Sequence, residues 1–121
     1  MEIKKICVVG TGTMARGIIQ TFAQAGYPVI AKGILDETYE TLEEGIGKGL
    51  ARLVAKGKME QSAMDAVLAN ITKTTEYAGC CDADLFIEAV PEEMKIKRAV
   101  FAEIEAIAKE SAIISSNTSS L

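Results

Sequence analysis

The 121-residue sequence predicts a doubly wound parallel α/β sheet with a helical hairpin inserted between the second and third strands. Short apolar runs alternate along the chain with longer amphipathic segments, as in parallel strands joined by helices. The run at residues 6–9 passes through a glycine turn directly into a helical segment. Residues 84–89 have a continuous apolar centre, which is typical of a strand buried on both faces. The expected strand order is 3-2-1-4-5.

The first strand, helix and second strand form one unit within about thirty residues. The strand covers residues 6–9, helix signals extend to Ala25, Gly26 is a left-handed cap, and the second strand covers residues 28–31. This spacing is that of a Rossmann-type βαβ unit.

The glycine turn in this unit predicts a dinucleotide site. Gly10 permits the tight turn, and Gly12 lets the backbone approach a pyrophosphate. Ala15, with Gly17 behind it, lets the helix pack close to the strand. The helix N-terminus offers unpaired N–H groups and a partial positive charge to the phosphates. The predicted pyrophosphate turn comprises Gly10, Thr11, Gly12, Thr13, Met14 and Ala15.

The hairpin consists of a long helix at residues 37–55 and a short one that ends near residue 69. Asp36 is a candidate cap for the first helix, and Gly57 ends it. Ser62 and Asp65 have capping-box spacing at the start of the second helix. Four cations follow the polar face of the hairpin, and on the residues alone they form a solvated helix face. They are Lys48, Arg52, Lys56 and Lys58.

The remaining elements complete the sheet. Residues 71–74 form a weak edge strand, and residues 84–89 form the buried fourth strand. A helix is expected from about residue 92 to residue 109, and residues 112–115 form the fifth strand. All five strands then belong to one domain covering residues 1–121.

Composition excludes several classes of function. The net charge of −4 and the pI near 4.9 argue against a nucleic-acid partner. The N-terminal apolar run is too short for a signal peptide, and no stretch is long enough to span a membrane. Three cysteines make neither a disulfide framework nor a C-x-x-C metal pair, which favours a reducing cytoplasm and no metal. The chain also contains no histidine.

Four stretches together resemble the (S)-3-hydroxyacyl-CoA dehydrogenase family, and most closely its bacterial 3-hydroxybutyryl-CoA members. They read GTGTMARGI, LARLVAKGKM, FIEAVPEEMKIKRAVF and SSNTSSL in chain order. The resemblance implies hydride exchange between a nicotinamide and a 3-hydroxyacyl-CoA or 3-ketoacyl-CoA, with 3-hydroxybutyryl-CoA and acetoacetyl-CoA as the expected pair.

The resemblance also assigns roles to individual residues. Glu92 and Lys97 match positions that contact the cofactor. Ser119 matches the serine that hydrogen-bonds the reacting oxygen, and Asn117 lies close to the nicotinamide. Lys56 matches a lysine that meets coenzyme A, so the hairpin would supply a cation to the CoA phosphates.

Two departures from the family alter these expectations. The catalytic histidine, its orienting glutamate and the helical second domain of the family are not in the sequence. We therefore expect a domain that is incomplete at its C-terminal end, binds nucleotide and is inactive alone. The complete enzyme would be a homo-oligomer, although most of the family's dimer interface is missing here. The alternative is a non-catalytic dinucleotide-binding module of the same fold.

The second departure concerns the cofactor. The family usually ends its second strand with an aspartate for the adenine-ribose hydroxyls, and here that position is Gly33, after Lys32. Loss of the carboxylate removes a hydrogen bond to a charged group and also the repulsion of a 2′-phosphate. With Lys32 and Arg16 as candidate cations, we expect NADP(H) to be preferred, with NAD(H) possible. Asp36 remains open as an alternative acceptor if the strand extends three residues further.

Overall fold

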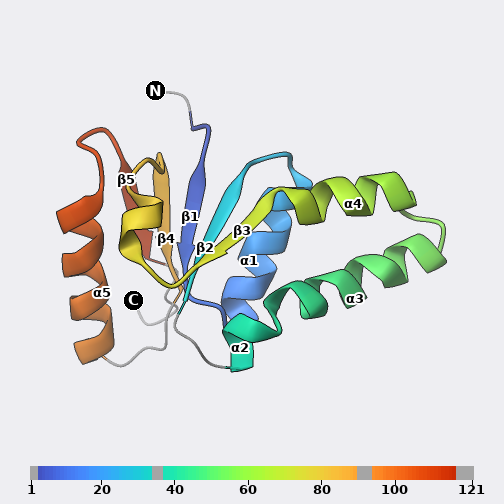
Figure 1. The fold of residues 1–121 in the computed structure, drawn as a ribbon, viewed down its shortest axis with the longest axis horizontal. Coiled ribbons are helices and arrows are strands. Elements are labelled where there is room, and N and C mark those ends of the chain that lie inside the picture. The colour runs from blue at the N-terminus through green and yellow to red at the C-terminus, as the bar shows by residue number, and fades with distance from the viewer. Residues whose placement is uncertain (1–2, 34–36, 90–93, 117–121) are drawn as a thin grey trace.

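A five-stranded parallel sheet runs through the middle of the molecule in the computed structural model (Figure 1). The structure describes residues 3–33, 37–89 and 94–116. The strand order is β3-β2-β1-β4-β5, which confirms the predicted fold class and order. The strands are β1 (Ile6–Val9), β2 (Val29–Lys32), β3 (Ile71–Thr74), β4 (Leu85–Glu88) and β5 (Ile113–Ser116).

β1 is the central strand, and all four of its residues are buried. Ile6 pairs with Val29 of β2 on one side and with Leu85 of β4 on the other. The bounds predicted for β1 and β3 match the structure. β2 and β5 each begin and end one residue later than predicted, and β4 is one residue shorter at each end.

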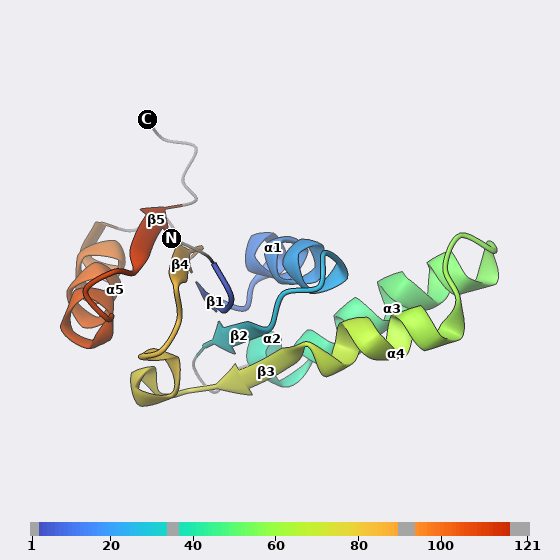
Figure 2. The ribbon, with the colours of Figure 1, turned by 90° about the horizontal axis from the view of Figure 1, so that it is seen from above.

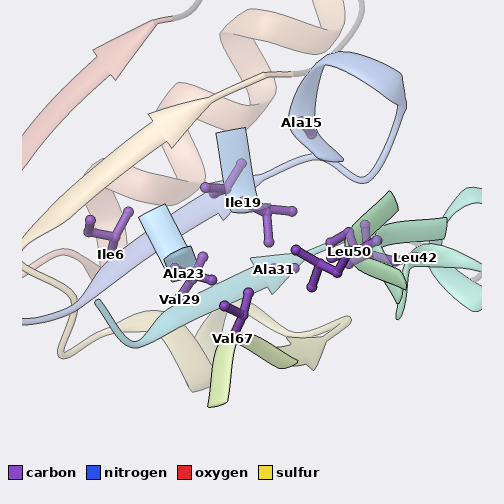
Figure 3. Close-up of a cluster of buried hydrophobic side chains, with 11 residues drawn as sticks. Ile6, Ala15, Ile19, Ala23, Val29, Ala31, Leu42, Leu50 and Val67 are labelled. Carbon is purple, nitrogen blue, oxygen red and sulfur yellow. The ribbon is translucent and has the colours of Figure 1, made fainter. Parts of the chain in front are cut away.

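One face of the sheet is covered by α1 (Thr13–Gln24), and α3 (Leu42–Ala55) and α4 (Gln61–Ala69) pack against α1 on the β3 side of the molecule. Apolar side chains of these three helices form a single cluster with alternate residues of β1 and β2, which Figure 3 shows. The cluster contains Ile6, Val8, Ala15, Ile19, Ala23, Val29, Ala31, Leu42, Ile46, Leu50 and Val67. The apolar stripes of these helices therefore face one shared core cluster.

The other face is covered by the short 3₁₀ helix η1 (Tyr77–Cys80) and by α5 (Met94–Ile107). Cys7 and Val9 of β1 point to this side, because successive side chains of a strand alternate between faces. They pack with Phe86 of β4 and with Val100 and Ile104 of α5. The sheet thus has a separate apolar layer on each face, as a doubly wound fold requires.

The hairpin of α3 and α4 extends away from the sheet, with its two helices side by side (Figure 2). The single helix predicted at residues 37–55 is wrong in one respect, because Thr41 divides it into α2 (Glu37–Glu40) and α3. Thr41 has φ −99° and ψ 7°, outside helical values, and its hydroxyl donates to the carbonyl of Glu37 at 2.7 Å. The Thr41 amide keeps its helical bond to the same carbonyl at 3.0 Å, and a hydroxyl that shares a carbonyl with the backbone in this way often bends a helix.

The helix ends predicted at Gly26 and Gly57 are confirmed. Both glycines have positive φ, +97° and +73°, and both helices end in a Schellman pattern. At the first, the Tyr27 amide donates to the Phe22 carbonyl at 3.1 Å, and the two rings meet edge to face. The expected capping box at Ser62 is wrong. The N-cap lies two residues earlier, at Glu60, whose carbonyl accepts the first backbone bonds of α4 and whose side chain makes no capping bond.

Candidate functional site

The turn after β1 ties three strands together at their carboxyl ends. The Gly10 amide donates to the Lys32 carbonyl at the end of β2 at 2.7 Å, and the Ala89 amide donates to the Val9 carbonyl at 2.9 Å. Gly10 has φ +133°, and a Cβ atom there would lie 2.5 Å from the Ala89 carbonyl oxygen. Only glycine fits this position, because other residues rarely adopt this positive φ and because the neighbouring backbone leaves no room for a Cβ atom.

The first turn of α1 leaves backbone donors available for an anion. Gly12 is the N-cap, with extended backbone, and its carbonyl accepts from the Arg16 amide at 2.9 Å. The first amides of a helix have no acceptor within the helix. No acidic side chain occupies this turn, Met14 is 57% exposed, and a Cβ atom at Gly12 would meet nothing within 4 Å. A phosphate can therefore approach these amides closely.

Close packing of α1 onto the sheet depends on Ala15 and not on Gly17. Ala15 is fully buried, and its Cβ would be 3.5 Å from a Cβ atom built at Gly10. Gly17 is exposed, and a Cβ atom there would meet nothing within 4 Å. The role predicted for Gly17 is wrong, because helical periodicity places residue 17 on the outer face of α1.

The end of β2 is tightly covered by two side chains. A Cβ atom at Gly33 would lie 2.8 Å from Cγ2 of Thr11 and 3.1 Å from Cδ2 of Tyr39. Thr11 is only 5% exposed, and its hydroxyl shares a hydrogen bond of 2.9 Å with the hydroxyl of Thr38. The approach of Thr38 and Tyr39 to the glycine turn was not predicted, because no pattern in the sequence indicates the bend between α2 and α3.

Lys32 was predicted to lie beside Gly33 as a cation for a phosphate, but its side chain lies elsewhere. Its side chain is on the η1 and α5 side of the sheet, like that of Ile30, and the residue is only 8% exposed. Its Nζ atom lies 4.1 Å from the centre of the Tyr77 ring, a cation–π contact. The expectation that Lys32 borders a 2′-phosphate beside Gly33 is therefore corrected: the space at Gly33 is filled and the ammonium group points elsewhere.

A buried pair of thiols lies near Lys32. The interaction between the thiols of Cys7 and Cys80 raises the pKa of Cys7 and lowers that of Cys80. The positive charge of Lys32 also lowers the pKa of Cys80. Within the described part of the chain, no group of three His, Cys, Asp or Glu side chains is arranged to hold a metal ion.

The Arg16 side chain extends from α1 toward α3 and borders a pocket of about 400 Å³. Its guanidinium lies against the backbone of Gly45, where a Cβ atom would be 2.7 Å from Nη1. Arg16 and Lys32 are thus on opposite sides of the sheet, and the structure does not bring them together as a pair.

The other predicted residues are spread along the chain. Lys56 is the exposed C-cap of α3, at the tip of the hairpin that lies away from the sheet (Figure 1). Lys97 belongs to α5, but its side chain is outside the described part of the structure, and so are Asp36, Glu92, Asn117 and Ser119. No helix among the described residues is long and apolar enough to cross a membrane.

Comparison with known proteins gives one consistent family. The family model for the 3-hydroxyacyl-CoA dehydrogenase NAD-binding domain matches residues 5–121. A 3-hydroxybutyryl-CoA dehydrogenase from Clostridioides difficile is 40% identical over 121 residues, which is 97% of this chain and 42% of that protein. The alpha subunit of the fatty acid oxidation complex from Psychrobacter arcticus is 37% identical over 99% of this chain and 17% of its own length.

The solved structures agree with these relatives. An (S)-3-hydroxybutyryl-CoA dehydrogenase from Ralstonia eutropha superimposes with a TM-score of 0.95 at 33% identity, over 99% of this chain and 42% of that one. The present chain thus spans less than half the length of each of these three proteins. The region they share is the one built around the glycine turn.

Proposed function

This chain belongs to the 3-hydroxyacyl-CoA dehydrogenase family, as its NAD-binding domain, and on that premise we propose that it holds the nicotinamide dinucleotide in a hydride-transfer reaction. The reaction interconverts a 3-hydroxyacyl-CoA and a 3-ketoacyl-CoA. The observation that supports the proposal best is the open amino end of α1, where Gly12 leaves the backbone donors uncovered. Gly10 fixes that turn to the ends of the neighbouring strands.

Within this reaction we propose the short-chain pair 3-hydroxybutyryl-CoA and acetoacetyl-CoA. Support comes from two proteins that are named 3-hydroxybutyryl-CoA dehydrogenases and align along nearly the whole chain. Lys56 would then meet the CoA phosphates, since its ammonium is exposed at the end of α3. Ser119 would hold the reacting oxygen, with Asn117 beside the nicotinamide and Glu92 and Lys97 on the cofactor.

Proton transfer requires a group that these residues do not provide. The bound dinucleotide would supply the hydride acceptor for carbon 3 of the substrate. A general base must take the hydroxyl proton, and the sequence has no histidine for that role. We therefore propose that the base lies on a segment beyond these 121 residues, and that this chain alone binds nucleotide without turnover. Assembly into a homo-oligomer and a cytoplasmic location belong to the same proposal.

We also propose that NADP(H) is preferred over NAD(H). A carboxylate at position 33 would have nowhere to go, because Thr11 and Tyr39 fill that space. The ribose hydroxyls of NAD(H) thus lose the charged acceptor that the family resemblance implies, and that loss costs roughly 1.5–3 kcal/mol. The cation for the extra phosphate would be Arg16, since Lys32 is buried under Tyr77.

Calorimetric titration with NADPH and NADH at the same low salt tests both proposals. We expect tighter binding of NADPH by roughly tenfold to a hundredfold. Gly12→Ala should keep the fold, because a Cβ atom there meets nothing within 4 Å. It should nevertheless weaken both ligands by about tenfold or more, since the methyl group takes the space of the pyrophosphate.

Gly17→Ala is the matched control, with the same added methyl group five residues along α1 and equally open space. Equal affinities in the two variants would mean that the pyrophosphate does not lie at the glycine turn. Tighter NADH binding by the unmodified chain would refute the cofactor preference and leave the dinucleotide site in place.

We keep as a second proposal a dinucleotide-binding module of the same fold that carries out no chemistry. An activity assay on the full-length gene product separates the two candidates. It follows the oxidation of NADPH or NADH by acetoacetyl-CoA at 340 nm. Turnover supports the dehydrogenase. Nucleotide binding without turnover supports the module.

A further inference from the structure

The pocket between α1 and α3 is basic in an otherwise acidic protein. Arg16 borders it from α1, and Glu44, Gly45, Lys48, Gly49 and Arg52 border it from α3. Three basic side chains face one acidic side chain, so the lining has a formal charge of +2, whereas the whole chain has −4. A volume of about 400 Å³ is within the range of small-molecule pockets. We call this space the Arg16 pocket.

Arg16 is held in this pocket without a partner. Its guanidinium lies flat on Gly45, with Nη1, Cζ and Nε at 2.7, 2.8 and 3.1 Å from the position of a Cβ atom. The Nε atom is buried and has no hydrogen-bond acceptor. A buried donor left unsatisfied is costly, so a native structure usually has a reason for it.

The other charges do not neutralise Arg16. Among the described residues, the carboxylate of Glu44 pairs with Lys48 at 3.3 Å, and neither Arg16 nor Arg52 has an ion pair. Two guanidinium groups therefore border one space with their donors available. Guanidinium is the side chain best suited to bind phosphate through two parallel hydrogen bonds.

The glycines of α3 make this arrangement possible. Gly45 gives Arg16 its resting place, and Gly49 keeps the adjacent turn of the helix open. Glycine inside a helix destabilises it relative to alanine. The glycines at these two positions therefore lower the stability of α3 and leave space for the pocket on that face of the helix.

From these observations we propose that the Arg16 pocket binds a phosphomonoester on a ribose. Such a group carries about −1.5 to −2 charges at neutral pH, which matches the lining. It is the 2′-phosphate that distinguishes NADPH from NADH, and equally the 3′-phosphate that distinguishes CoA from dephospho-CoA. The inference rests on the proposed function for this choice of ligands, and the pyrophosphate remains assigned to the glycine turn.

The test compares ligands in pairs that differ by this one group. Affinities for NADPH, NADH, CoA and 3′-dephospho-CoA are measured by calorimetry for the unmodified chain and for Arg16→Gln. The two pairs are NADPH with NADH, and CoA with 3′-dephospho-CoA. In the pair whose phosphate occupies the pocket, Arg16→Gln should weaken binding of the phosphorylated ligand by roughly tenfold to a hundredfold, and binding of the other ligand much less. The preference of the unmodified chain should shrink as salt is raised. The affected pair identifies the source of the phosphate.

A second variant tests the pocket without removing the charge. Gly45→Ala places a methyl group where the guanidinium rests, so Arg16 must move, and the same pair should lose its preference. Gly47→Ala is the matched control on the same helix, since a Cβ atom there meets nothing within 4 Å. It should leave all four affinities as they are.

The outcomes separate this proposal from the proposed function. If NADH binds but both phosphate preferences are the same in Arg16→Gln as in the unmodified chain, the pocket proposal is refuted and the dinucleotide site stands. If Arg16→Gln lowers both members of each pair equally, Arg16 is structural and the proposal is also refuted. An unmodified chain that binds none of the four ligands would overturn both.

Discussion

At the scale of single residues, the contact between Thr11 and Gly33 joins the glycine turn to the end of β2. Gly33→Ala would place a methyl group 2.8 Å from Cγ2 of Thr11. Overpacking of this kind costs about 1–3 kcal/mol, and we expect the free energy of unfolding in urea to fall by that amount.

Thr11→Ser removes the methyl group that Gly33→Ala would strike and keeps the hydroxyl that bonds Thr38 at 2.9 Å. In the double variant the loss caused by Gly33→Ala should therefore be partly recovered. A double-mutant cycle measures this coupling directly. Strictly additive effects would show that Thr11 does not limit position 33.

At the scale of elements, α3 is weakened by its own glycines. Gly47 lies in the helix interior, and a Cβ atom there meets nothing within 4 Å, so Gly47→Ala should stabilise the chain by about 0.5–1 kcal/mol. Gly57→Ala should act in the opposite direction, because Gly57 ends the same helix at φ +73°. Urea unfolding of both variants checks the two signs, and a loss of stability in Gly47→Ala would contradict the account of α3.

The elements were more predictable from sequence than their junctions. Strands and helices follow from apolar periodicity, and the ends at Gly26 and Gly57 follow from glycine alone. The bend at Thr41 was missed, because a threonine hydroxyl that bonds its own backbone leaves no periodic signal. The burial of Lys32 and the packing of Arg16 against Gly45 were missed for a related reason: closeness in sequence to the site does not specify what a side chain packs against.

At the scale of the whole molecule, Asp84 connects the amino end of β4 to the segment before β1 and to the segment after α5. Its carboxylate accepts from the amides of Lys4 and Lys5 at 2.8 and 3.0 Å, and Lys109 pairs with it from beyond α5. The hydrogen bond from Lys109 and those from the two amides lower the pKa of Asp84 to about 2. A depressed pKa means that this stabilisation is fully present above the ordinary carboxyl pKa and is lost as the pH falls through the folded value.

Thermal unfolding between pH 2 and pH 7 tests this link. Asp84→Asn should lower the melting temperature throughout the range above about pH 4, and the difference from the unmodified chain should close toward pH 2. Asp82→Asn is the control, because the Asp82 side chain is 61% exposed and its pair with Lys5 contributes little. A difference that does not depend on pH would assign the effect of Asp84→Asn to packing and not to charge.

The strand order has a consequence for how the chain folds. Ile6 pairs with Val29 nearby in sequence, but also with Leu85, which lies much further along the chain. Loop closure over the longer separation costs more entropy and slows folding. We therefore infer that β1, α1 and β2 associate first, while one edge of β1 stays uncovered until β4 arrives. On a ribosome, that edge of an apolar strand would be exposed until the fourth strand has been synthesised, which makes it the point where the nascent chain most needs protection from aggregation.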